Sequence, residues 1–196
     1  MNRGNIVKKI IIVAIWGVLL ALLFIAAQNL PTIRHITEDS ETTYEHATDE
    51  YRIDLTGRWQ VSVDGPGELI LLQEEANASI VCNLEVGGYD YLSSKEIADK
   101  IQESLGNSFD AVEFSQRIGE TEAILYDTLY FTGTCTLGDE SLSSEHYVIH
   151  PSEGIRLYVN YFYPQNADDA IVEQGRNSIF SIYFFDLEKI YQKYLT

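Results

Sequence analysis

The longest apolar run of the chain lies near its N-terminus. Residues 10–27 contain no charged side chain and no proline, which gives 18 residues in a row. About 20 apolar residues are needed for a helix to cross the hydrocarbon core of a bilayer, and a helix satisfies its own backbone hydrogen bonds there. Arg3, Lys8 and Lys9 precede the run. The positive-inside bias therefore predicts a single-pass signal-anchor over residues 1–28, with everything after it outside the cytoplasm.

A cleaved signal peptide is the alternative interpretation of this segment. Ala26 and Ala27 offer small residues for cleavage, but signal peptides usually have a shorter apolar region of roughly 7–15 residues. Lipid attachment would require a cysteine directly after the run. The first cysteine is Cys82, so a lipid anchor is not expected.

After the apolar run, a polar segment is followed by a segment in which apolar and polar residues alternate. Residues 29–50 are polar and acidic without an apolar period, which predicts a flexible stalk. From Tyr51 onward, apolar and polar residues alternate with the period of two that is typical of strands. The turn cluster at residues 64–67 makes residues 59–73 a hairpin, because Gly and Pro preset turn geometry. The remaining strands are expected at 51–55, 79–86, 111–117, 122–135, 145–150 and 155–163.

The clearest helix signal follows Ser93. Ser93 and Glu96 have the spacing of a capping box, and apolar residues then recur at helical spacing up to Leu105. The pattern predicts a helix over Ser94–Leu105. A second helix is expected after Asn166 as its cap, residues 179–185 continue it or form a strand, and residues 188–195 form a short terminal helix.

This order of elements predicts an α+β fold. Consecutive strands with short connections favour an antiparallel sheet, and the few helices must pack on it to bury their apolar sides. We expect one extracytoplasmic domain over residues 51–196, with Trp59 in its core.

The same elements resemble the PsbP-like family, whose fold is shared by a Ran-binding nuclear import factor. The matching segments are a strand that leads into Trp59, a Gly/Pro-rich hairpin, a Ser-capped helix, a strand meander and a final helix: residues 55–59, 64–67, 93–97, 126–135, 155–163 and 177–180. The resemblance implies an α/β/α sandwich around an antiparallel sheet. It carries over no catalytic residue, and it implies a binding or assembly factor, since members of the family are mostly of that kind.

Charge limits the choice of partners. All 30 acidic residues lie after residue 28 with 10 of the 13 cations, so this part carries a net charge of −20. Such a field repels phosphate backbones and excludes nucleic acid as a partner. The acidity serves solubility or forms a docking surface for a cationic partner.

The two cysteines, Cys82 and Cys135, both fall at apolar positions of strands. An extracytoplasmic location permits a disulfide between them. The alternative is two buried free thiols.

Chemical motifs are sparse. The sequence has no Gly-x-Ser-x-Gly elbow and no phosphate-binding loop. His146 and His150 would lie about 13 Å apart on a strand, too far for one metal ion. We therefore expect no metal, no cofactor and no catalytic site.

Three tyrosines on one predicted strand are the best candidates for binding a partner. They are Tyr158, Tyr161 and Tyr163, and the alternation places Tyr158 on the opposite face of the strand from the other two. Tyrosine suits interfaces because a rigid ring contacts the partner while its hydroxyl stays hydrated. The alternative is that helices cover both faces of the sheet and the rings belong to the core.

Together these features predict a membrane-anchored extracytoplasmic module that binds or assembles with a protein partner. The alternatives are a structural subunit of an envelope complex and an enzyme with an unrecognised site. An enzyme requires a pocket in which polar groups converge, whereas a binding module requires an exposed apolar or aromatic patch.

Overall fold

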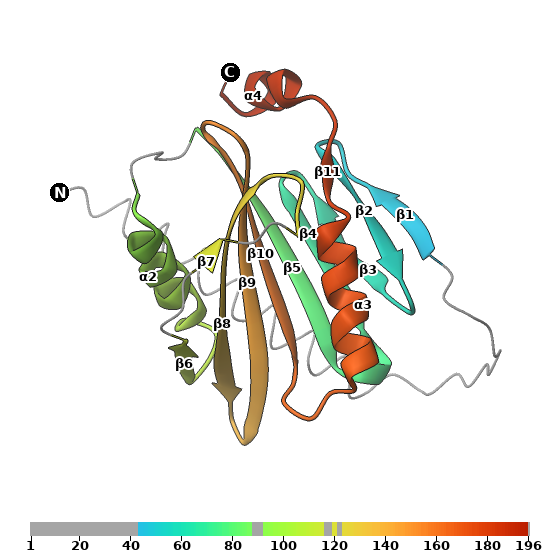
Figure 1. The fold of residues 1–196 in the computed structure, drawn as a ribbon, viewed down its shortest axis with the longest axis vertical. Coiled ribbons are helices and arrows are strands. Elements are labelled where there is room, and N and C mark those ends of the chain that lie inside the picture. Colours follow the sequence, from blue (N-terminus) through green and yellow to red (C-terminus); the bar gives the residue numbers. More distant parts are fainter. Residues whose placement is uncertain (1–42, 88–91, 116–118, 121–122, 196) are drawn as a thin grey trace.

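The computed structural model describes residues 43–87, 92–115, 119–120 and 123–195 (Figure 1). The predicted anchor over residues 1–28 and most of the predicted stalk lie outside these residues. Within the described ranges, no helix has the length and apolar character needed to cross a membrane.

The main structural element is an eight-stranded antiparallel sheet, as the alternating pattern predicts. The strands follow one another across it in the order β3-β4-β5-β10-β9-β8-β6, and β7 pairs with β8 beside β6. Their bounds are β3 Gln60–Gly65, β4 Glu68–Gln73, β5 Ala78–Val86, β6 Ala111–Phe114, β7 Gly119–Glu120, β8 Asp127–Leu137, β9 Glu140–Ser152 and β10 Ile155–Pro164. The predicted hairpin at residues 59–73 is the pair β3–β4.

A second, three-stranded sheet has the order β1-β2-β11. It consists of β1 (Thr43–Ala47), β2 (Tyr51–Thr56) and β11 (Tyr183–Phe184). The domain therefore begins earlier than residue 51, and the expectation that the stalk extends to residue 50 is wrong. The sequence pattern does not predict β1, because four of its five side chains are exposed and no buried apolar residues alternate along it. Backbone pairing with β2 holds this strand in place.

Three helices and one 3₁₀ turn complete the described chain. Helix α2 spans Ser94–Leu105, as predicted, followed by α3 (Asp169–Phe180) and α4 (Leu187–Leu195), with η1 at Glu74–Ala76. Helix α3 is capped by Asp168, which accepts the N–H of Ala170 at 2.8 Å, and not by Asn166 as expected. Residues 179–185 were expected either to continue the helix or to form a strand, and they do both. The helix ends at Phe180, and strand β11 follows.

Helices α2 and α3 pack on opposite faces of the large sheet, because they contact core residues of opposite alternation on its strands, and Figure 1 shows them at opposite sides of the view. On the α3 face, α3 and the small sheet enclose the larger core, where Trp59 is 2% exposed. On the α2 face, α2 packs through Ile97, Ala98 and Ile101 against Phe131 and other apolar residues of β8 and β9. The sandwich architecture implied by the resemblance is therefore present.

Helix α4 crosses one end of the large sheet (Figure 1). Its Lys193 ammonium lies 2.6 Å from a Glu50 carboxylate oxygen, which also accepts the Tyr194 hydroxyl at 2.7 Å. Glu50 lies between β1 and β2 and is 2% exposed. Tyr191 donates to the backbone carbonyl of Glu153 in the β9–β10 turn, so the last helix joins two turns that are distant in sequence.

The start of α2 gives a direct test of the sequence rule. Ser93 accepts the N–H of Glu96 at 3.3 Å, and the Glu96 carboxylate accepts the N–H of Ser93 at 2.8 Å. We expect Ser93→Ala to lower the free energy of unfolding by about 1 kcal/mol, measured by urea denaturation. The double variant with Ser94→Ala should lose more, because Ser94 can no longer replace the cap.

Ser104→Ala is the matched control, because it removes an exposed hydroxyl from the last turn of the same helix. Its effect should stay within about 0.5 kcal/mol. Equal unfolding curves for all variants and the parent would mean that the capping box does not stabilise α2.

Candidate functional site

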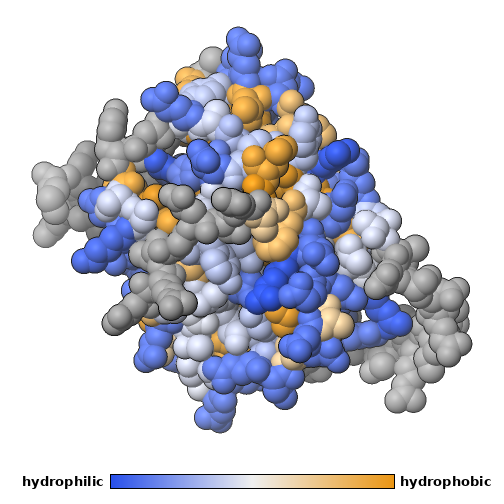
Figure 2. All heavy atoms as spheres, in the orientation of Figure 1, coloured by the Kyte–Doolittle hydropathy of each residue, from blue (hydrophilic) through white to orange (hydrophobic). Residues whose placement is uncertain are grey.

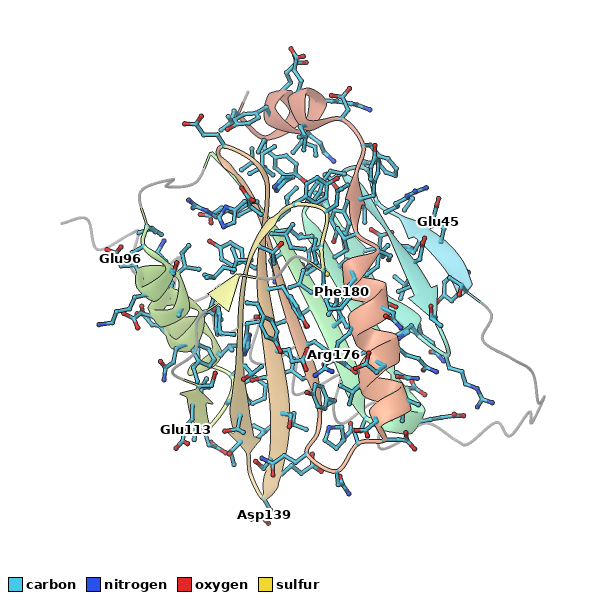
Figure 3. The ribbon with its side chains drawn as sticks, in the orientation of Figure 1. Glu45, Glu96, Glu113, Asp139, Arg176 and Phe180 are labelled. Carbon is cyan, nitrogen blue, oxygen red and sulfur yellow. The ribbon has the colours of Figure 1, made fainter. Side chains whose placement is uncertain are left out.

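A buried charge cluster joins α3 to the large sheet. Glu145 on β9 is 1% exposed, and its carboxylate accepts from the Arg176 guanidinium at 2.6 Å and 3.1 Å. It also accepts the hydroxyls of Tyr147 at 2.6 Å and Tyr163 at 2.8 Å. Arg176 projects from α3, as Figure 3 shows, and also pairs with Glu173 at 2.7 Å. We call Glu145, Tyr147, Tyr163 and Arg176 the Glu145 cluster.

The cluster keeps each of its groups in its ordinary charge state. Burial raises the pKa of Glu145, but hydrogen bonds from Arg176, Tyr147 and Tyr163 outweigh burial and lower the pKa overall. Burial raises the pKa of Tyr147 and of Tyr163, and their hydrogen bonds to Glu145 raise it further. The hydrogen bond to Glu145 raises the pKa of Arg176. A general base needs a pKa near the working pH, so this arrangement suits a fixed structural contact.

Large apolar side chains are exposed in two other segments of the domain, before β8 and at β11. Leu125 is 72% exposed, Phe185 48% and Tyr183 43%. The segment before β8 touches β11 directly, because the Tyr126 hydroxyl accepts the N–H of Phe184 at 3.0 Å. The three exposed residues lie next to this hydrogen bond in sequence, on the two segments that it joins, and we call them the aromatic patch. Figure 2 shows hydrophobic atoms gathered where this segment approaches the C-terminal end of α3.

The three tyrosines predicted to bind a partner do not form such a surface. Tyr161 is 0% exposed and donates to the carbonyl of Ile171 in α3 at 3.1 Å. Tyr163 is half-buried in the Glu145 cluster. Tyr158 lies half-buried against the α2 core, and its hydroxyl donates to Glu85 at 2.7 Å. The structure thus corresponds to the core alternative, with Tyr158 on the opposite face from the other two.

Sequence reasoning missed both the aromatic patch and the Glu145 cluster. A signal for the patch existed in residues 182–185, because an edge strand with Phe184 inward must turn Tyr183 and Phe185 outward. That signal was hidden by the open choice between helix and strand. The available signal for the Glu145 cluster was an acidic residue within the apolar strand around Tyr147. Its partner Arg176, however, lies 31 residues away in another element.

Both cysteines are free and buried. Cys82 on β5 faces the larger core, and two strands separate β5 from β8, which carries Cys135. Three strand spacings alone amount to about 14 Å, whereas a disulfide needs Cα atoms roughly 4.4–6.8 Å apart. Of the two alternatives, this fold therefore holds free thiols. Burial raises the pKa of Cys82 to about 12, so its thiol stays protonated.

His146 is a buried neutral side chain on the α2 face. It is 0% exposed, stacks on Phe131 with ring centroids 5.0 Å apart, and its ring nitrogens lie 2.7 Å from Asn160 Oδ1 and 3.0 Å from Ser144 Oγ. Burial lowers the pKa of His146 to about 4. His150 lies four residues along the same strand. No group of three or more metal-ligating side chains occurs within the described residues.

The Glu145 cluster predicts a large effect when its cation is removed. Arg176→Met leaves a carboxylate buried without its charge partner, and we expect the free energy of unfolding to fall by about 2–3 kcal/mol. The double variant with Glu145→Gln should recover part of this loss, because no charge then remains buried. Urea denaturation measures both.

Arg58→Met is the matched control for this experiment. Arg58 pairs with Glu75, and the two side chains are 62% and 70% exposed. Removing this surface pair should cost less than about 1 kcal/mol. An equally small loss for Arg176→Met would contradict the structural role of the cluster.

His146 predicts a pH dependence of stability above the range in which carboxylates titrate. Burial holds the pKa of His146 in the folded chain at about 4, below the ordinary histidine pKa of 6.5, so the unfolded chain binds the proton first as the pH falls. The stabilisation is complete above pH 6.5 and is lost progressively toward pH 4, with about 2 kcal/mol lost at pH 5. Unfolding curves at pH 7 and pH 5 should differ less in His146→Gln.

Comparison with known proteins identifies the fold. No family model matches this chain, and no curated protein matches its sequence. Among solved structures, the Ran-binding protein Mog1p from Saccharomyces cerevisiae superposes with a TM-score of 0.55 at 7% identity, covering 76% of this chain and 98% of Mog1p. Cyanobacterial PsbP (CyanoP) from Synechocystis sp. PCC 6803 gives a TM-score of 0.55 at 11% identity, with 80% and 99% covered.

A third solved structure is similar in the same way. LpqN from Mycobacterium tuberculosis, described as involved in cell envelope biogenesis, gives a TM-score of 0.50 at 11% identity, covering 75% of this chain and 91% of LpqN. At such identities the likeness concerns the fold alone. It confirms the resemblance in fold drawn from the sequence: this chain has a PsbP/Mog1-like fold.

Proposed function

We propose that this chain is a membrane-anchored binding or assembly module whose folded domain works outside the cytoplasm and contacts a protein partner. The observation that carries the proposal is the aromatic patch of Leu125, Tyr183 and Phe185. Exposing three large apolar side chains on two joined segments costs solvation free energy, and exposed apolar patches mark interaction sites. Aromatic residues are enriched at the centres of interfaces.

The surroundings of the patch favour a partner with a basic rim. Asp127, Asp186 and Glu188 follow or flank the patch in sequence and are exposed, whereas Arg52 lies over the Tyr183 ring at 5.2 Å and pairs with Glu45. A partner that brings apolar side chains to the centre and Lys or Arg to the edge would complement this surface. Acidic rims of this kind mainly raise the rate and specificity of association.

The anchor is proposed from the apolar run at residues 10–27 and the cations before it. The similar structures support a binding role outside catalysis, since Mog1p is a Ran-binding protein, and LpqN is involved in cell envelope biogenesis. The Glu145 cluster supports it from the chemical side, because its buried carboxylate is fully engaged in holding α3 and has a lowered pKa.

One experiment tests location and binding together. A membrane-impermeant, lysine-reactive cross-linker is added to spheroplasts that express the full-length chain. We expect the domain to react from outside and to form one discrete heavier adduct with a protein partner. The double variant Leu125→Ser and Phe185→Ser should still react with the reagent but should lose most of the adduct, about tenfold if the two contacts contribute 1–2 kcal/mol together.

Val61→Ser is the matched control, since Val61 is 39% exposed on β3 and does not belong to the patch. This variant should keep the adduct. A domain that reacts only after lysis would overturn the proposed location. A domain that reacts from outside but forms the same adducts with and without the patch would overturn the proposed binding surface and leave the location intact.

A further inference from the structure

The aromatic-patch residue Phe185 lies between strand β11 and helix α4. Strand β11 ends at Phe184, and α4 begins at Leu187. Asp186 joins the two elements, because its carboxylate accepts the N–H of Lys189 at 3.1 Å, as an N-cap residue does. Figure 1 shows β11 leading up to α4, which lies across the end of the large sheet. The position of Phe185 therefore depends on the contacts of the elements on either side of it.

The strand before Phe185 is held from its inner side. The ring of Phe184 is 3% exposed and lies against the rings of Tyr51 and Tyr126, with centroids 5.6 Å and 5.4 Å away. The backbone N–H of Phe184 donates to the Tyr126 hydroxyl at 3.0 Å. Successive side chains of an extended segment point to opposite sides, so an inward Phe184 turns Tyr183 and Phe185 outward.

Glu50 is bonded to both ends of the segment that follows β11. Its backbone carbonyl accepts the N–H of Phe185 at 3.1 Å. Its buried carboxylate accepts hydrogen bonds from the Lys193 ammonium at 2.6 Å and from the Tyr194 hydroxyl at 2.7 Å. The hydrogen bond to Glu50 also raises the pKa of Lys193, so the ammonium keeps its charge. One residue of the β1–β2 turn therefore connects the aromatic patch to the far end of α4.

The position of α4 is also specified by shape, because a side chain at any of three glycines would meet this helix. They are Gly67 in the β3–β4 turn, Gly87 after β5 and Gly154 in the β9–β10 turn, with φ of 73°, 74° and 70°. A Cβ atom at Gly87 would lie 2.6 Å from the Leu195 side chain, and one at Gly154 would overlap the Tyr191 hydroxyl. Helix α4 can lie this close to the sheet only across turns without side chains.

We propose that Glu50 and α4 position the aromatic patch, so that Tyr183 and Phe185 bind the protein partner only while α4 is docked. Glu50 is a positioning residue in this arrangement, since it acts through the backbone of Phe185. A loose segment must be ordered when it binds, and this ordering lowers affinity. The inference rests on the proposed binding at the patch, and it names the element that controls that binding.

The first readout of the test is deuterium uptake by the purified full-length chain in detergent. Glu50→Ala removes the carboxylate that holds α4 but keeps the backbone carbonyl that accepts from Phe185. Adding Tyr191→Ala removes the contact of α4 with the β9–β10 turn. We expect uptake at residues 183–190 to become about tenfold faster or more in the double variant, because local opening exposes these amides. Uptake at residues 140–152 of β9 should keep the parent's rate.

The second readout is the adduct formed by the lysine-reactive cross-linker on spheroplasts. Both variants retain every lysine, so a lost adduct does not reflect lost reaction sites. The adduct of the double variant should fall about fivefold, in proportion to the fraction of molecules in which α4 is docked. If uptake rises throughout the double variant, the domain has unfolded, and Glu50→Ala alone then provides both comparisons.

Asp49→Ala is the matched control, because it removes a neighbouring carboxylate that also pairs with Lys193, at 3.0 Å. Asp49 is 84% exposed, so the loss of this pair should change neither readout. Parent-like uptake at residues 183–190 in the double variant would overturn the positioning. Faster uptake with an undiminished adduct would overturn the dependence of binding on α4. If Leu125→Ser with Phe185→Ser also keeps the adduct, the proposed function fails, and uptake separately decides whether α4 holds Phe185.

Discussion

The ion pair between Glu145 and Arg176 is the interaction on which the arrangement of the layers depends. A carboxylate that is 1% exposed in the middle of a sheet is unfavourable unless a cation and hydrogen-bond donors reach it. Arg176 from α3 supplies the cation, and Tyr147 and Tyr163 supply the donors from two adjacent strands. The pair therefore favours one position of α3 on the sheet. It also favours the β9–β10 register that brings Tyr147 and Tyr163 to the same carboxylate.

Close packing beside this pair enforces the same position. Gly175 precedes Arg176, and a Cβ atom at that position would lie 2.3 Å from the Tyr161 ring. Tyr161 in turn meets Trp59 edge-on, with ring centroids 6.1 Å apart. The helix can approach the sheet only where a residue without a side chain faces the ring, so charge and shape select one placement. The consequence is that α3 covers β9 around Glu145 and Tyr147, where Arg176 and Phe180 contact it, while Ser141 near the start of β9 is exposed.

The sequence predicted the elements whose burial alternates and missed those whose position depends on distant residues. Helix α2 was predicted from Ser93 to Leu105 because its capping box and apolar stripe are local, and the large sheet was predicted because half-buried strands alternate. Strand β1 is exposed on nearly every side chain, so no local pattern marks it. The start of α3 was misplaced by two residues because Asn166 and Asp168 are both good caps, and only the final path of the chain selects between them.

The candidate site was less predictable for the same physical reason. Tyr158, Tyr161 and Tyr163 have the composition of an interface, but composition does not show whether a helix covers a strand. Tyr183 and Phe185 are exposed because β11 is a two-residue edge strand, a fact that depends on its pairing with β2. The glutamate that anchors α3 lies within an apolar strand, and its partner becomes visible only when the two elements are side by side in space.

The contact between Glu50 and α4 has a mechanical consequence for a domain held at its N-terminal end. The strands β1 and β2 run antiparallel and meet at the turn near Glu50. Tension applied at residue 43 would therefore separate their backbone pairs one after another, from Thr43 toward this turn. The Lys193 and Tyr194 bonds to Glu50 lie where this opening would arrive. These bonds to α4 would then resist further separation, so unfolding under tension would be limited to the β1–β2 hairpin. The large sheet would remain folded at forces that detach β1.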